Sequence, residues 1–142
     1  MRTRQQGVAL VEFAFMLPLL LVLSLAATEL GRAVYRYNTT AKAVRDAVRY
    51  LSVQTPGTHT TEARNLIVYG NLAGTGALLD PALTAANVGA PTWQTAGSDP
   101  LINTVTVRVT GYRFRPLFGS VFGTTFASFT FSDITATMRS PL

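Results

Sequence analysis

The stretch VALVEFAFMLPLLLVLSLAA, residues 8–27, decides the fold of this chain. Only Glu12, Pro18 and Ser24 interrupt its run of apolar residues. At about 1.5 Å per residue, a helix of this length is about 30 Å long, which matches the hydrocarbon core of a bilayer. We therefore predict a transmembrane helix over residues 8–28, preceded by a polar leader, residues 1–7.

The composition of the whole chain agrees with one membrane-inserted element and one small domain. Of its 142 residues, 48% are hydrophobic and 13% are charged, and this length leaves room for one modest domain beside the helix. The net charge of +5 comes from 12 basic and 7 acidic residues. The basic residues are scattered rather than interleaved with aromatic residues, so nucleic-acid binding is not expected. Cysteine is absent, which excludes disulfides, zinc–thiolate sites and thiol catalysis.

Three interpretations of the N-terminal segment are open. A cleaved secretory signal would end at a small-x-small site such as Ser24-Leu25-Ala26. An uncleaved signal anchor needs only the apolar length. A prepilin-type leader needs a glycine directly before the apolar run and an acid five residues after that glycine, and Gly7 and Glu12 meet this requirement.

Glu12 favours the prepilin-type leader. A carboxylate inside a membrane span costs at least about 2.5 kcal/mol, so it persists where it has a partner. Cleavage between Gly7 and Val8 would create an amino group on Val8, one helical turn from Glu12 on the same face. That positive group and the N-terminal end of the helix dipole would stabilise the carboxylate. In the alternative without cleavage, Glu12 lies at the membrane edge and its carboxylate reaches interfacial water.

Apolar residues continue beyond the membrane run in an amphipathic pattern over residues 29–53. Their spacing of four and three residues is typical of a helix with one packing seam. The seam comprises Leu30, Val34, Tyr37, Ala41, Val44, Val48 and Leu51. Five basic residues lie off this seam and are expected on a solvated face: Arg32, Arg36, Lys42, Arg45 and Arg49. We expect one helix over residues 8–53, kinked at Pro18, whose seam packs on partner helices or on the chain's own head.

The remaining residues, 54–142, are predicted to form a small α+β head outside the membrane. Thr55-Pro56-Gly57 ends the long helix, because proline and glycine interrupt helical structure. Residues 61–69 have the apolar spacing of a short second helix, which Gly70 closes.

The strands of the head are predicted from alternation. Valines alternate with polar residues from Val105 to Val109, inside residues 103–114, as in a half-buried strand. A partner strand is expected over residues 126–138 and a weaker one over residues 85–95. The fold class is thus α+β: a long transmembrane and amphipathic helix, one short helix and a small antiparallel β-sheet.

Large aromatic residues of the head have two interpretations. Trp93, Phe114, Phe118 and Phe122 are expected in the core, because large apolar side chains of a small domain are mostly buried. A surface for a partner is the alternative. Gly119 and Gly123 repeat the spacing of a helix-packing motif, but they lie in a predicted loop, where a role in turns is expected.

No residue of the head is predicted to be catalytic. His59 is the single histidine and lies in a threonine-rich linker, where a solvated loop residue is expected. Asp80, Asp99 and Asp133 are isolated in the sequence, so they do not suggest a pair of catalytic carboxylates. Neither a nucleophile elbow nor a phosphate-binding glycine motif is present. We therefore expect no enzyme activity, no cofactor, no metal site and no small-molecule substrate.

The segment GVALVEFAFMLPLLLVLSLAATELGRAVYRYNTTAKAVRDAVR, residues 7–49, resembles the TadE-like family of pilus-assembly pseudopilins. Gly7 and Glu12-Phe13 resemble the processing site of this family. Leu17-Pro18-Leu19 resembles its proline after the first turns of the helix. The resemblance depends on the ordered combination of these motifs, because each one alone is weak.

Two further motifs extend the resemblance. Glu29-x-Gly31-Arg32 resembles the small charged motif that follows the membrane run. Residues 43–49 resemble the closing helix rich in alanine and arginine, but Asp46 and Val48 depart from the residues expected there. Residues 102–139 are loosely similar to the C-terminal strands of the family.

The resemblance implies a minor pseudopilin of a tight-adherence (Flp-type) pilus system, without catalytic activity. A prepilin peptidase would cut between Gly7 and Val8, and Glu12 with Phe13 would set the register of assembly. The other partners would be related minor pseudopilins, the major Flp pilin, the inner-membrane assembly platform and the lipid bilayer. Because major Flp pilins have little beyond the helix, the head points to a minor component.

The resemblance also implies a topology. The chain would cross the bacterial inner membrane once, with its leader in the cytoplasm and its head in the periplasm, and it would stay there or enter the extracellular pilus. The distribution of charge opposes this orientation, because four basic residues follow the membrane run within residues 32–45 and only Arg2 and Arg4 precede it. A positive-inside count alone would place the head in the cytoplasm. Processing of the leader requires the opposite orientation, which we prefer.

Two other classes of function are open. One is an uncleaved, membrane-anchored binding module of the envelope, and the other is an exported enzyme with a signal peptide. The first residue of the mature chain distinguishes the three classes: Val8 for a pseudopilin, Met1 for an anchor, or a residue just after Ala26 for an exported enzyme.

Overall fold

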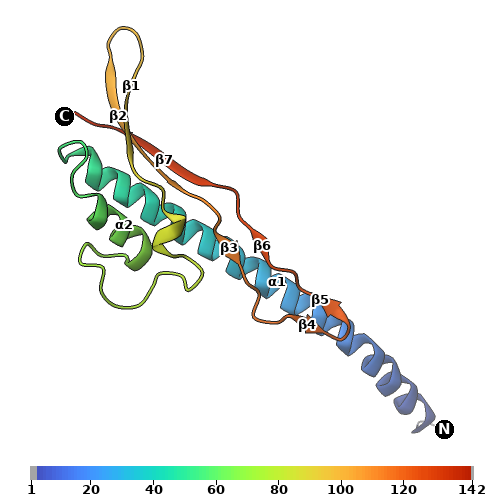
Figure 1. Ribbon diagram of the computed structural model, residues 1–142. Coiled ribbons are helices and arrows are strands. Elements are labelled where there is room, and N and C mark those ends of the chain that lie inside the picture. The colour runs from blue at the N-terminus through green and yellow to red at the C-terminus, as the bar shows by residue number, and fades with distance from the viewer. Residues whose placement is uncertain (1–2, 142) are drawn as a thin grey trace.

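The computed structural model describes residues 3–141, and it describes side chains from Gly7 onward. One long helix runs the length of the molecule, and the head packs around its C-terminal part (Figure 1). The α+β fold class predicted from the sequence is confirmed. In chain order, the elements are α1 (Thr3–Ser52), α2 (Thr60–Tyr69), the 3-10 turn η1 (Ala85–Asn87), β1 (Thr92–Ala96), β2 (Ile102–Val109), β3 (Arg113–Phe114), β4 (Ser120–Val121), β5 (Thr124–Thr125), β6 (Phe129–Thr130) and β7 (Ile134–Arg139).

Helix α1 has 50 residues and continues through Pro18. It begins at Thr3, before the predicted start at Val8, because the polar residues between them contain no helix breaker and can extend the helix. It ends at Ser52, and a turn with Gly57 at φ 84° follows it. Between Gly7 and Ser52, α1 contains a stretch long and apolar enough to cross a membrane, and no residue of that stretch is buried.

The main sheet has three antiparallel strands in the order β1-β2-β7, with β2 in the centre. Val105, Val107 and Val109 are almost fully buried, whereas Arg108 on the opposite face is exposed. The alternation predicted from the sequence is therefore confirmed. The opposite face carries polar cross-strand contacts, such as the hydrogen bond of 2.8 Å between the hydroxyls of Thr106 and Thr137.

Two of the predicted strands are each divided into shorter strands in the structure. The predicted strand 103–114 breaks after Val109, where Gly111 has a φ of 64°. The predicted partner strand 126–138 is divided into β6 and β7. The resulting short pieces pair as two-stranded ribbons, β3 with β6 and β4 with β5. The weak strand predicted over residues 85–95 is wrong at its start, where η1 lies, and β1 begins later.

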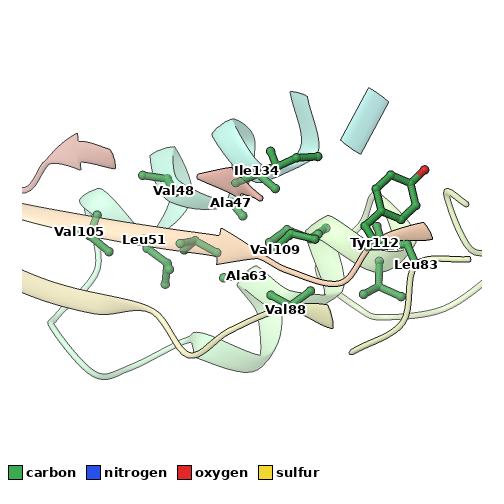
Figure 2. Close-up of a cluster of buried hydrophobic side chains, with 14 residues drawn as sticks. Ala47, Val48, Leu51, Ala63, Leu83, Val88, Val105, Val109, Tyr112 and Ile134 are labelled. Atoms are coloured by element: carbon green, nitrogen blue, oxygen red, sulfur yellow. The ribbon is translucent and has the colours of Figure 1, made fainter. Parts of the chain in front are cut away.

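The core of the head lies between the C-terminal part of α1, helix α2 and the main sheet (Figure 2). Figure 2 shows Ala47, Val48 and Leu51 of α1 facing side chains of α2 and β2. Because α1 supplies a large share of these buried side chains, the head has no core without it. The N-terminal part of α1 projects away from this core (Figure 1).

The two short ribbons follow α1 from the core toward its N-terminus, and the β4–β5 hairpin lies at their far end (Figure 1). Aromatic contacts hold the first ribbon on the helix: the ring of Phe131 lies 5.5 Å from Tyr37 of α1 and 4.9 Å from Tyr112. Phe114 is buried beside Phe129, with 5.3 Å between their ring centroids. The prediction of core packing is therefore right for Phe114.

Candidate assembly site on the long helix

The predicted processing site lies at an open position on α1. A Cβ added to Gly7 would meet no atom within 4 Å, and the side chain of Val8 is exposed. Both residues are helical, so a peptidase has to unwind this turn before it can cut. Glycine makes unwinding easier, because it destabilises a helix interior by about 1 kcal/mol relative to alanine.

Glu12 and Phe13 are also exposed on α1. Glu12 lies four residues after Val8, so their side chains share one face of the helix. Among the side chains that the structure describes, none forms an ion pair with Glu12. A group on another molecule, or a new amino group on Val8, can therefore reach this carboxylate.

The seam divides into an outer and an inner part. Leu30 and Val34 are 66% and 53% exposed, whereas Val44 and Val48 have no exposed surface. The inner part, which ends at Leu51, packs against α2 and the sheet. Tyr37 and Ala41 lie between the two parts and are half-buried.

A buried carboxylate marks the boundary between the free helix and the head. Glu29 is only 5% exposed. Its Oε2 lies 2.6 Å from Nη1 of Arg32, and its Oε1 accepts a hydrogen bond of 3.0 Å from the backbone N–H of Leu117. Glu29 therefore ties the helix to a segment 88 residues later in the chain.

A second buried carboxylate, Asp80, lies beside Arg36, about two helical turns after Glu29 along α1. Its Oδ2 lies 3.2 Å from Nε of Arg36 and accepts a hydrogen bond of 2.9 Å from the hydroxyl of Tyr112. Its Oδ1 accepts a bond of 2.7 Å from the backbone N–H of Ala82. Buried charges persist where they are paired in this way. We call Glu29, Arg32, Arg36, Asp80 and Tyr112 the clasp.

The clasp corrects two predictions from the sequence. Arg36 was expected on a solvated face, and Asp80 was expected to be isolated, but they form an ion pair. The sequence analysis missed them because 44 residues separate the partners, and helical spacing carries no information on pairs so far apart. Glu29 and Arg32 belong to the charged motif noted in the sequence, but their ion pair and the contact of Glu29 with Leu117 were not predicted, and Arg32 was also expected on a solvated face.

Burial raises the pKa of the Tyr112 hydroxyl to about 12. A hydrogen bond with Thr40 opposes this shift, while the hydrogen bond to Asp80 and the charge of Asp80 add to it. The ordinary value is 10.0, so Tyr112 is a neutral hydrogen-bond donor throughout the physiological pH range.

His59 lies on the surface at the start of α2, as the sequence predicted. Its Nδ1 lies 3.1 Å from Oε1 of Glu62 and 3.3 Å from the hydroxyl of Tyr50. A hydrogen bond with its own backbone, followed by the bond to His59, lowers the pKa of Glu62. Within residues 3–141, no three histidine, cysteine or acidic side chains lie close enough together to hold a metal.

Residues 7–49 match the model of the family described as TadE-like protein. We call these residues, which are similar to that family, the TadE-like segment. The match confirms the resemblance to the TadE-like family of the tight-adherence pilus system, and its limits fall at Gly7 and Arg49. No curated protein and no solved structure matches the chain.

The TadE-like segment contains the features of α1 described above. It begins at the predicted processing site and includes Glu12, the outer part of the seam and the helical half of the clasp. The other half of the clasp, Asp80 and Tyr112, comes from the head. The head is thus attached to α1 at residues of the TadE-like segment.

Proposed function

We propose that this chain is a minor pseudopilin of a tight-adherence type IV pilus machine, which acts in the assembly or priming of the pilus and has no catalytic activity. The observation that carries the proposal is the position of the TadE-like match. It begins at Gly7, where the polar leader meets the apolar run, and it includes Glu12. A long apolar helix that fits a membrane anchor agrees with this assignment.

In this proposal, a prepilin peptidase cuts the leader on the cytoplasmic side of the inner membrane. The new amino group of Val8 then lies one turn from the carboxylate of Glu12, on its own chain or on a neighbour. An unpaired carboxylate at that depth is unfavourable, so pairing stabilises one axial register of adjacent helices. Phe13 adds apolar contact beside the pair.

The proposed partners are other minor pseudopilins, the major Flp pilin and the inner-membrane assembly platform. The outer part of the seam, Leu30 and Val34, offers apolar surface to a neighbouring helix because the head leaves it uncovered. The inner part is already occupied by the head. We propose that the head lies in the periplasm, where the clasp keeps it at a constant height above the membrane.

The first residue of the mature chain tests this function. The full chain is expressed with and without a prepilin peptidase, and its mass is measured. We expect the mature chain to start at Val8, and we expect Gly7→Leu to block maturation. Gly31→Leu is the matched control, because a Cβ at Gly31 also meets no atom within 4 Å, and it should mature normally.

The alternatives give different masses. A chain that stays at Met1 in the presence of the peptidase would support an uncleaved anchor that presents the head as an envelope binding module. A chain that starts just after Ala26 would support an exported protein with a signal peptide. Either result would contradict the pseudopilin function.

Glu12→Ala tests the role of the carboxylate after processing. We expect this variant to mature normally and to stay in the membrane, but to lose co-purification with the other pseudopilins and to lose piliation. Ser24→Ala, at another polar position of the apolar run, should keep both properties. Full assembly of the Glu12→Ala protein would show that the carboxylate only reaches interfacial water.

A further inference from the structure

Residues 116–132 form a charge-free segment of the head with exposed apolar side chains. No charged residue lies between Arg115 and Asp133. Leu117 and Phe122 are each 67% exposed, and Phe118 and Phe129 are 42% and 45% exposed. The prediction that Phe118 and Phe122 pack in the core is therefore wrong. Exposed apolar residues that are grouped in this way mark a contact with a partner or a membrane.

This segment lies where α1 would leave the membrane. The backbone N–H of Leu117 binds the carboxylate of Glu29, which follows the apolar run directly. From there the chain continues along α1 in the direction of its N-terminus and forms the β4–β5 hairpin, which ends several turns before that terminus (Figure 1). Val22 and Leu25 are half-buried on this part of the helix, whereas most of the apolar run is exposed.

The turn of the hairpin contains a residue that is unusual for its geometry. Phe122 and Gly123 connect β4 to β5, with φ angles of 49° and 79°. Two successive positive φ angles are typical of a type I′ turn, in which asparagine and glycine are favoured. A bulky residue with a positive φ is a genuine outlier, and such strain is common at functional sites. The hairpin thus holds a large aromatic ring outward at its tip.

A basic pocket lies at the start of this segment, where Pro116 and Leu117 line it. It has a volume of about 490 Å³, and Arg32, Arg36, Arg113, Arg115 and Leu117 are among the residues that line it. Glu29 and Asp80 pair with the first two arginines. Among the described residues, no carboxylate forms an ion pair with Arg113 or Arg115. The pocket therefore keeps two uncompensated positive charges next to an apolar surface.

We propose that residues 116–132 and this pocket form a second membrane contact. The aromatic side chains of the hairpin enter the interfacial layer of the leaflet on the side of the head, and Arg113 and Arg115 bind the phosphates of anionic lipids. This inference depends on the placement of α1 in a membrane, and it does not depend on processing or pilus assembly.

Two features favour lipid over a protein partner as the occupant. The apolar surface of the hairpin continues the lipid-facing surface of α1, because Leu117 is attached to Glu29 at the end of the apolar run. Arginines beside aromatic residues match the chemistry of the interface, where phosphates and amphipathic rings lie at the same depth. The contact stays in the interface, because the free edges of a two-stranded hairpin cannot be satisfied in hydrocarbon.

The absence of cysteine allows a direct test by site-specific labelling. Ser120→Cys carries a nitrobenzoxadiazole probe on β4 and keeps all the aromatic residues. Val53→Cys is the control, because Val53 is 61% exposed and directly follows the end of α1, about 36 Å from Glu29 along the helix axis. Both full-length proteins are reconstituted in phosphatidylcholine vesicles, with and without lipids that carry a nitroxide near the headgroup.

We expect the probe at residue 120 to show blue-shifted emission and quenching by the nitroxide lipids, and the probe at residue 53 to show neither. Phe122→Asn should lower the quenching at residue 120, although asparagine suits the turn better and should keep the hairpin folded. Water-like emission at both positions would overturn the proposal. Protection of residue 120 that grows with the protein-to-lipid ratio would overturn it in favour of a second copy.

The basic pocket is tested in vesicles that mix phosphatidylglycerol with phosphatidylcholine. The full-length protein is extracted, and the ratio of the two lipids that co-purify with it is measured. Arg113→Gln and Arg115→Gln should each lower the enrichment of phosphatidylglycerol by about fivefold. Arg139→Gln, an exposed position on β7, should leave it unchanged. Equal enrichment in all the variants would overturn the role of the pocket.

Discussion

The two halves of α1 differ in what surrounds their apolar side chains. In residues 8–28, most leucine, valine and phenylalanine side chains are exposed, and only a few, such as Val22 and Leu25, are half-buried. In residues 43–52, the apolar side chains lie on one face and are buried against the head. One continuous helix thus serves two environments. The first half is suited to an apolar environment that the chain itself does not supply, and the second half is part of a protein core.

The clasp lies at the transition between the two halves. It uses buried ion pairs instead of apolar contacts, and these pairs have a defined geometry. Glu29 and Arg36 each bind a different segment of the head. The clasp therefore ties α1 to two defined segments of the head just after the apolar run, which a continuous apolar seam would not do.

The largest expected effect is the difference in stability between two variants, one with a new carboxylate in the inner part of the seam and one with it in the outer part. Val48→Asp places an unpaired carboxylate in the core and should destabilise the head by about 4 kcal/mol or more. Val34→Asp lies on exposed surface and should change the stability of the head by about 0.5 kcal/mol or less. Urea unfolding of the full chain in detergent, followed by circular dichroism, measures both effects. Equal losses would mean that the head also covers the outer part of the seam.

A smaller effect is expected from the clasp. Asp80→Ala leaves the guanidinium of Arg36 and the hydroxyl of Tyr112 without their acceptor, and it should cost about 3 kcal/mol. Asp133→Ala is the matched control, because its contact with Arg108 is 3.9 Å long and exposed and contributes about 0.5 kcal/mol or less. The same unfolding assay applies. If the two variants lose equal stability, the clasp is not a structural boundary.

The smallest effect concerns pH. Because the pKa of Tyr112 rises from 10.0 to about 12 on folding, its contribution is complete below pH 10 and is lost as the pH rises from 10 to 12. The loss is about 2 kcal/mol. An absorbance titration of the phenolate, together with circular dichroism, follows it. Tyr112→Phe should remove this alkaline step, whereas Tyr35→Phe, at an exposed position, should retain it. An unchanged step in Tyr112→Phe would assign it to another group.

The sequence predicted the features that depend on local periodicity. The apolar run predicted the long helix, and the alternation from Val105 to Val109 predicted β2. The ordered motifs from Gly7 to Arg49 indicated the family resemblance. Each of these signals depends on the spacing of residues within one segment.

The features that the sequence analysis missed depend on contacts between distant segments. Arg36 meets Asp80, and Glu29 meets Leu117, only because the head folds back along α1. The exposed position of Phe122 also follows from the tertiary structure, since hydrophobicity alone favours burial. Burial tendencies therefore gave the wrong environment for this residue.

The shared core also has a consequence for the order of events in biogenesis. Val44, Val48 and Leu51 of α1 are part of the core of the head. A head without this helix therefore lacks one side of its core. The helix also leaves the ribosome before the head, because it precedes the head in the chain. The later residues therefore fold against a helix that is already present, and a fragment that lacks the apolar run has to keep residues 29–52 to become a folded antigen or crystallisation target.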